Sequence, residues 1–114
     1  MISQAVQQRQ AVRVRGRSYV AFVFSPVVPI AGWLAEIDET LAHSPGFFVR
    51  RPIVLDLSAA DLSGSAIMHL ISSLETRSIR VLGLEGVDAS RISPSMPPLL
   101  TDGRHSERAR EAAG

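Results

Sequence analysis

The sequence predicts an α/β fold, in which an N-terminal β-hairpin is followed by βαβ-type units to give a mixed sheet with helices packed on it. Strict alternation of apolar and polar residues near the start is typical of a half-buried strand. Two almost uniformly apolar runs further on are typical of buried parallel strands. Around them, apolar residues recur at helical spacing. Right-handed crossovers between the parallel strands are expected.

The predicted hairpin occupies residues 11–24. Residues 11–15 alternate strictly, with valines on one face of the strand and arginines on the other. Gly16-Arg17 is expected to form the tight turn, because glycine tolerates the positive φ that two-residue hairpin turns require. Residues 18–24 return as a strand whose two faces are both largely apolar. Such a strand is either covered on both sides or leaves an apolar patch for a partner.

Two helices and two buried strands are predicted downstream of the hairpin. The first helix starts near Pro29, which suits the first helical turn, and ends before Ser44-Pro45-Gly46. The runs 53–58 and 78–84 predict the buried strands. A second helix between them is carried by residues at helical spacing, namely Ile67, Leu70, Ile71 and Leu74.

The pattern weakens beyond the last of these strands. Asp88 is expected to cap a short helix, since its carboxylate can accept from free backbone N–H groups of a first turn. Residues 99–101 predict a short edge strand. We expect residues 1–10 to form a flexible N-terminus, residues 11–103 the folded domain, and residues 104–114 a linker or tail without large apolar side chains.

Composition limits the class of protein. The chain has 114 residues, 46% of them hydrophobic and 20% charged, as expected of one globular domain. It has no cysteine, which excludes disulfides and thiol catalysis. All 12 basic residues are arginine, which excludes a lysine Schiff base and the lysine of a P-loop. The net charge of +1 does not by itself predict nucleic-acid binding.

Targeting signals are also lacking in the sequence. The longest apolar stretch is far shorter than the roughly 18 residues that span a bilayer. The first residues show no basic region followed by an apolar block, which would mark a secretory signal. The sequence therefore predicts a soluble cytoplasmic domain.

The sequence predicts neither a catalytic set nor a metal site. None of His43, His69 and His105 lies three or four residues from another histidine or from a suitable pair of carboxylates. Ser63-Gly64-Ser65 does not match a nucleophile elbow and is expected to start the second helix, with Ser63 or Ser65 as its cap. Asp56, at a strand end, is expected to stabilise a turn. The prediction is a non-enzyme without cofactors. An enzyme would instead require a pocket with convergent polar groups near Asp56.

Three stretches of the chain, taken in their order and spacing, resemble the MinC family of bacterial division-site inhibitors. They are Arg15-Gly16 with Ser18 behind it, residues 45–48 followed by 51–58, and residues 79–86 closing with 96–104. Together they span roughly residues 12 to 104. The resemblance is to the amino-terminal domain of that family.

This resemblance implies a domain that antagonises assembly of the tubulin-like protein FtsZ by binding it, without catalysis. Its role would be to block septum formation at the wrong sites. In the family, a second β-helical domain dimerises and binds the membrane-recruiting ATPase MinD. That domain has no counterpart in this chain, so MinD binding is expected only through the absent domain. FtsZ is the expected partner, with no nucleic acid and no direct membrane binding.

The family's first hairpin is implicated in FtsZ antagonism, and this role carries over to Arg15 and Gly16. Arg13, Arg17 and Tyr19 extend the same surface. Arginine and tyrosine are enriched at protein interfaces, which agrees with a partner-binding site. The alternative is a solvated edge strand whose charges deter aggregation.

A second resemblance is to the anti-sigma factor antagonist (STAS) domain. It is carried by residues 54–58, Asp61 and the serine-rich helix start. In that family a phosphorylatable serine begins this helix, and the added charge is read by a partner. Here Ser63 or Ser65 would be that serine, although the usual Asp-Ser-Ser-Gly order is changed. The two families are expected to be similar in fold, so the predicted fold is STAS-like. The closing run 96–103 favours MinC.

Overall fold

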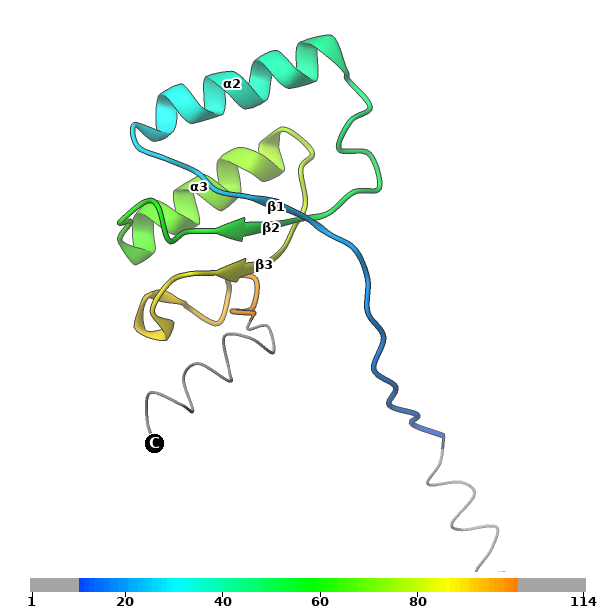
Figure 1. Ribbon diagram of the computed structural model, residues 1–114. Coiled ribbons are helices and arrows are strands. Elements are labelled where there is room, and N and C mark those ends of the chain that lie inside the picture. The colour runs from blue at the N-terminus through cyan, green and yellow to red at the C-terminus, as the bar shows by residue number, and fades with distance from the viewer. Residues whose placement is uncertain (1–10, 101–114) are drawn as a thin grey trace, which may run out of the picture.

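Three short parallel strands and two helices make up a two-layer α/β arrangement in a computed structural model, which describes residues 11–100 (Figure 1). The predicted α/β class and the alternation of strands with helices are confirmed. The elements are β1 (Phe22–Phe24), α2 (Ile30–His43), β2 (Ile53–Asp56), α3 (Gly64–Thr76), β3 (Val81–Glu85) and a 3-10 helix, η1 (Ala89–Arg91).

The strands lie in the order β1-β2-β3, and both neighbouring pairs are parallel. The outer edge of β3 is covered, since the Leu84 N–H donates to the Pro98 carbonyl at 2.8 Å and the Leu100 N–H donates to the Leu84 carbonyl at 2.7 Å. Leu99 thereby forms a parallel bridge with Leu84, which confirms an edge pairing where one was predicted. On the outer edge of β1, no strand pairs within residues 11–100.

The predicted N-terminal β-hairpin is wrong. Residues 13–20 form no strand, and Val12 and Val14 are 80% and 92% exposed. Gly16 does not adopt a positive φ, as the predicted turn would need. An alternating pattern produces a strand only where one face can be buried, and a lone two-stranded ribbon is marginal in water. The described sheet is therefore purely parallel, not mixed.

The two predicted helices are present, and they start differently. Ser63 caps α3, because the Ala66 N–H donates to its Oγ at 3.2 Å; such a cap is worth about 1 kcal/mol. Pro29 is the N-cap of α2 rather than part of its first turn, and provides no side-chain cap. The short helix predicted after Asp88 is confirmed as η1, capped by a hydrogen bond of 2.9 Å from the Ser90 N–H to the Asp88 carboxylate.

The core lies between the sheet and the helices, which cover one face of it (Figure 1). Ile53 and Leu55 of β2 are fully buried there, together with α3 side chains such as Ile67 and Leu74. Burial of one such side chain contributes about 1.5–3 kcal/mol. This packing fixes the positions of the loops at the amino and carboxyl ends of the strands.

Some predictions fall outside the described residues. These are the flexible N-terminus at residues 1–10, the end of the domain at 101–103, and the tail at 104–114 with His105. Within residues 11–100, none of the helices combines the length and the apolar character needed to cross a bilayer.

Candidate partner-binding surface

Residues 12–20 form an arm that leaves the body of the protein at the amino end of β1 (Figure 1). The predicted site residues Arg13, Arg15, Gly16, Arg17 and Tyr19 all lie on this arm, and all are exposed. The structure therefore keeps them together along one segment but does not pack them against the core. The solvated edge strand, the alternative for these residues, would need a strand that the arm does not form.

A hollow of about 300 Å³ opens at the base of the arm. It exists because β1 and β2 pair from Phe22 and Ile53 onward, whereas the two chain segments diverge before that point. Its walls come from the arm and from the turn before β2, namely Val20, Ala21 and Phe22 on one side and Arg50, Arg51 and Pro52 on the other. We call this hollow the fork.

Arg50 and Arg51 are candidate functional residues that sequence reasoning missed. The Arg51 guanidinium carbon lies 5.7 Å from the centroid of the Phe22 ring and 5.6 Å from that of Phe47, so the cation rests against two aromatic faces. These rings stack on each other at 5.9 Å with an interplanar angle of 18°. Arg50 has φ 59°, a left-handed conformation that costs a non-glycine residue about 1–2 kcal/mol. The available signal was a pair of arginines directly before a proline and a buried strand.

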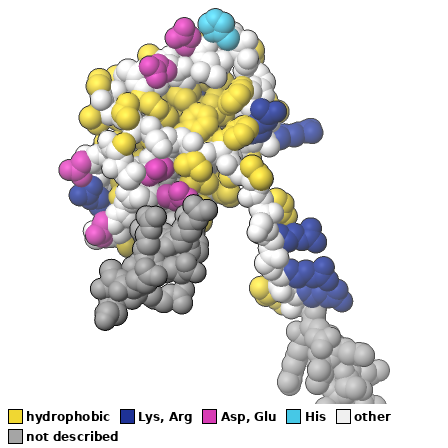
Figure 2. All heavy atoms as spheres, viewed as in Figure 1, with side chains coloured by type: hydrophobic (Ala, Val, Ile, Leu, Met, Phe, Trp, Pro, Cys, Tyr) yellow, Lys and Arg dark blue, Asp and Glu magenta, His cyan; other side chains and the backbone are white. Residues whose placement is uncertain are grey.

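Arginines predominate toward the amino ends of the strands. Because all three strands are parallel, their amino ends lie together at one end of the sheet and their carboxyl ends at the opposite end. At the amino end lie the arm arginines with Arg50, Arg51 and Arg80, although Glu75 lies beside Arg80 and Glu39 near Phe47. At the carboxyl end lie Asp56, Asp61, Glu85 and Asp88. Figure 2 shows arginines along the arm and at its base, with acidic side chains spread over the body of the protein. The arm and the fork therefore suit an acidic partner.

The carboxyl end has a structural role. Asp56 accepts hydrogen bonds from the Ser58 N–H at 3.0 Å and from the Ser25 hydroxyl at 3.4 Å, and so stabilises a turn as predicted. Arg91, the exception in sign at this end, pairs with Asp61 at 2.7 Å. Within residues 11–100, no group of three His, Cys, Asp or Glu side chains could hold a metal ion.

The perturbed pKa values belong to structural contacts. Arg77 joins the two helices, since its Nε donates to Asp38 Oδ1 at 2.6 Å and its Nη1 to the Ser73 carbonyl at 2.8 Å. The hydrogen bond from Arg77 lowers the pKa of Asp38, and the same bond raises the pKa of Arg77. The Ser90 backbone N–H lowers the pKa of Asp88. None of these groups is part of the arm.

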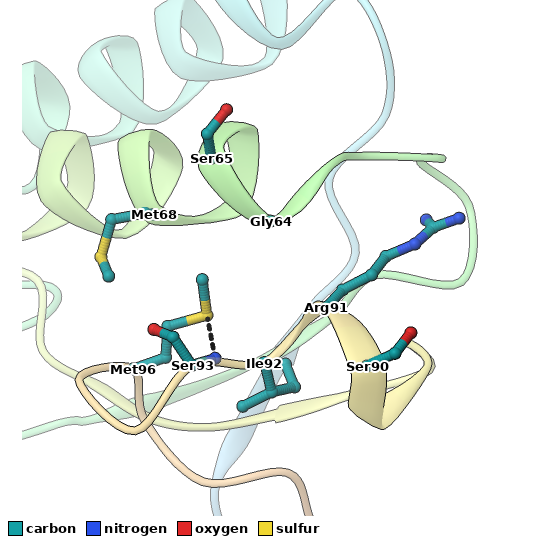
Figure 3. Close-up of a pocket in the computed structure, with 8 residues that line it drawn as sticks. All are labelled: Gly64, Ser65, Met68, Ser90, Arg91, Ile92, Ser93 and Met96. Carbon is teal, nitrogen blue, oxygen red and sulfur yellow. Dashed lines mark hydrogen bonds between the residues drawn. The ribbon is translucent and has the colours of Figure 1, made fainter.

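A second hollow, of about 420 Å³, lies between the start of α3 and residues 90–96 (Figure 3). Met68, Ile92 and Met96 provide its apolar lining. Figure 3 shows the side chains of Arg91 and Ser65 directed away from it. Nothing at this hollow continues the basic surface of the arm.

Known proteins with similar sequences place the chain in context. A probable septum site-determining protein MinC of Rhodopseudomonas palustris (strain BisA53) is 68% identical over 105 residues, which are 92% of this chain and 46% of the relative. The protein of the same name from Bradyrhizobium diazoefficiens is 64% identical over 91% of this chain and 45% of its own length. That of Agrobacterium fabrum is 38% identical over 90% of this chain and 43% of its own length.

The chain is homologous to MinC proteins. It matches the amino-terminal part of these MinC relatives and spans about half their length. Comparison with models of protein families finds no match. The predicted resemblance to MinC is confirmed, whereas the STAS alternative gains no support from the names of the relatives. The STAS-like character of the fold stays a prediction.

Proposed function

We propose that this chain is the FtsZ-antagonising part of a MinC-type cell-division inhibitor, which prevents septum formation at the wrong sites. Identity of 68% to a protein named as a septum site-determining MinC is the observation that carries the proposal. The chain would act in the cytoplasm by binding FtsZ and opposing its assembly into filaments. In this proposal it makes and breaks no covalent bond and uses no cofactor.

The arm is the proposed contact with FtsZ. Arg13, Arg15 and Arg17 offer guanidinium groups that bind carboxylates bidentately, and Tyr19 offers an aromatic anchor that is 81% exposed. No atom of the described residues lies within 4 Å of a Cβ added at Gly16. The bare backbone there allows a partner to approach closely between Arg15 and Arg17.

The proposal assigns other Min-system contacts to a different part of the protein. MinD binding and dimerisation would belong to the second domain known in the family, and the chain of 114 residues would bind neither MinD nor nucleic acid nor membrane directly. A pull-down of MinD with the purified chain should therefore recover none.

Sedimentation of FtsZ tests the proposal. With GTP present, micromolar chain should reduce the FtsZ recovered in the pellet while GTP turnover stays close to that of FtsZ alone. Arg15→Gln should weaken this effect several-fold at nearly unchanged melting temperature, since exposed charges add little to stability. The matched control is Arg91→Gln, the same change at the opposite end of the sheet, which should keep full activity. Pelleting that does not respond to the wild-type chain at any concentration would refute the proposal.

A further inference from the structure

We propose that the arm and the fork together bind one extended, acidic segment of the partner, with carboxylates at every second residue. The inference deepens the proposed function, because it takes the arm as the partner-binding surface. It adds Arg50 and Arg51 to that surface and specifies the chemistry of what binds there.

The spacing of the arm arginines sets the spacing of the ligand. In an extended chain successive side chains point to opposite sides, so residues two apart share a side at intervals of roughly 7 Å. Arg13, Arg15 and Arg17 follow this period, and Tyr19 continues it. A partner strand with carboxylates at alternate positions matches the same interval.

The backbone of the arm is available for pairing. Residues 13–20 have no backbone hydrogen bonds to other described residues, and every side chain among them is exposed. An extended segment laid along the arm can therefore exchange strand-type N–H···O=C bonds with it, in the manner of β-strand addition. Such pairing would order the arm and align the alternating charges of the two chains.

The fork is the fixed end of the surface. Neither Arg50 nor Arg51 forms an ion pair with a carboxylate in residues 11–100. Arg51 is held by its two aromatic neighbours, and Arg50 keeps a backbone conformation that few non-glycine residues adopt. Two guanidinium groups beside a hollow of about 300 Å³ offer paired donors for a carboxylate side chain.

The apolar rim of the fork indicates what should flank that carboxylate. Phe22 is 40% exposed, and Val20 is 97% exposed. An apolar side chain next to the carboxylate could cover both. The preferred ligand is thus an alternating acidic and apolar strand.

Charge complementarity selects this occupant over two others. The arm of a second copy would bring its own arginines to Arg50 and Arg51, and like charges placed together are unfavourable. A membrane presents a plane of headgroups, whereas the fork is a recess of about 300 Å³. An acidic protein segment meets both the charge and the shape.

Fluorescence anisotropy with labelled decapeptides tests the inference on the full chain. The probe alternates valine and glutamate, and its control carries the same residues in two blocks. We expect the alternating peptide to bind at least about tenfold more tightly, and more weakly as ionic strength rises. Equal affinity for the two peptides would overturn the inference, because register with the arm would then not matter.

Two variants of the fork complete the test. Arg50→Gly suits the left-handed backbone and Arg51→Gln keeps much of the side chain, so the double variant should fold; circular dichroism checks this. It should bind the alternating peptide about tenfold more weakly, while Arg91→Gln should bind as the wild type does. If the double variant unfolds, Arg50→Gly alone should still weaken binding several-fold. Unchanged affinity of the folded variant would overturn the role of the fork.

Parallel measurements separate this inference from the proposed function. Peptide binding without any effect on FtsZ pelleting would remove the proposed function and leave the inference standing. If the fork variants still inhibit FtsZ assembly in full, the inference about the fork is overturned and the proposed function stands. Two further measurements test the other occupants. Sedimentation with phosphatidylglycerol vesicles tests a membrane, and the oligomeric state of the chain tests a second copy. Preferential binding to vesicles, or self-association that Arg50→Gly abolishes, would overturn the inference.

Discussion

The two helices are alike in sequence character and differ in how they are buried. α2 has 14 residues and α3 has 13, and both are amphipathic. α3 buries four side chains, Ile67, Leu70, Ile71 and Leu74, whereas α2 buries only Ile37. The strands follow the same division, because the outer edge of β3 is covered by residues 98–100 and that of β1 is open within the described chain.

This difference shows where stability and binding are located. The half of the fold built from β2, α3 and β3 holds most of the fully buried side chains, so it should be the last part to open. The half built from the arm, β1 and α2 contains the arm arginines and, together with residues 50–52, forms the fork. A binding surface on the less tightly packed half can become ordered on contact with its partner while the other half holds the fold.

Truncation of one leucine in each helix should give the largest difference in the free energy of unfolding. Leu74 of α3 is fully buried, so Leu74→Ala should lower the free energy of unfolding by about 2–5 kcal/mol. Leu34 of α2 is half-buried, and Leu34→Ala should cost only about 1 kcal/mol. Urea denaturation of both variants measures this. Equal losses would show that α2 contributes as much as α3 and would break the comparison.

The elements that could be predicted from the sequence are those whose burial leaves a local pattern. Residues 53–55 are apolar and buried, as expected of a strand enclosed by the fold, and this enclosure is visible as an uninterrupted apolar run. The cap at Ser63 and the turn at Asp56 depend on hydrogen bonds to residues two or three positions away, so they too could be predicted.

The hairpin and the fork could not be predicted for the opposite reason. Valine and arginine alternate in residues 12–15, but this pattern does not reveal whether a neighbouring strand exists to bury the valines, and here they are exposed. The fork brings Phe22 next to Arg51, and these residues are distant along the chain and meet only through parallel pairing of β1 with β2. The candidate arginines of the arm were found because the resemblance to MinC singled out Arg15-Gly16.

The covered edge of the sheet should respond to a single added methyl group. A Cβ at Gly83 of β3 would collide with the Leu100 side chain and lie 3.1 Å from the Pro98 carbonyl oxygen. Gly83→Ala should therefore cost about 1–3 kcal/mol, because the segment that covers this edge must shift. The control is Gly46→Ala, where no described atom lies within 4 Å of the added Cβ. Thermal unfolding compares the two. A stable Gly83→Ala protein would mean that residues 98–100 are not firmly held on β3.

The smallest expected effect concerns the link between the two helices, through Asp38 of α2 and Arg77, the C-cap residue of α3. The hydrogen bond from Arg77 lowers the pKa of Asp38 below its ordinary 3.8, so the unfolded chain takes up a proton before the folded one does as pH falls. The stabilisation is complete above pH 3.8 and is lost as pH falls through the lowered pKa of the folded state. Asp38→Asn should therefore melt slightly below the wild type at neutral pH, and the gap should narrow in strong acid. Because α2 is the less buried helix, amide exchange in this variant should increase in α2 more than in α3. Equal increases in both helices would show that they open together, and the division of the fold into two unequal halves would not hold.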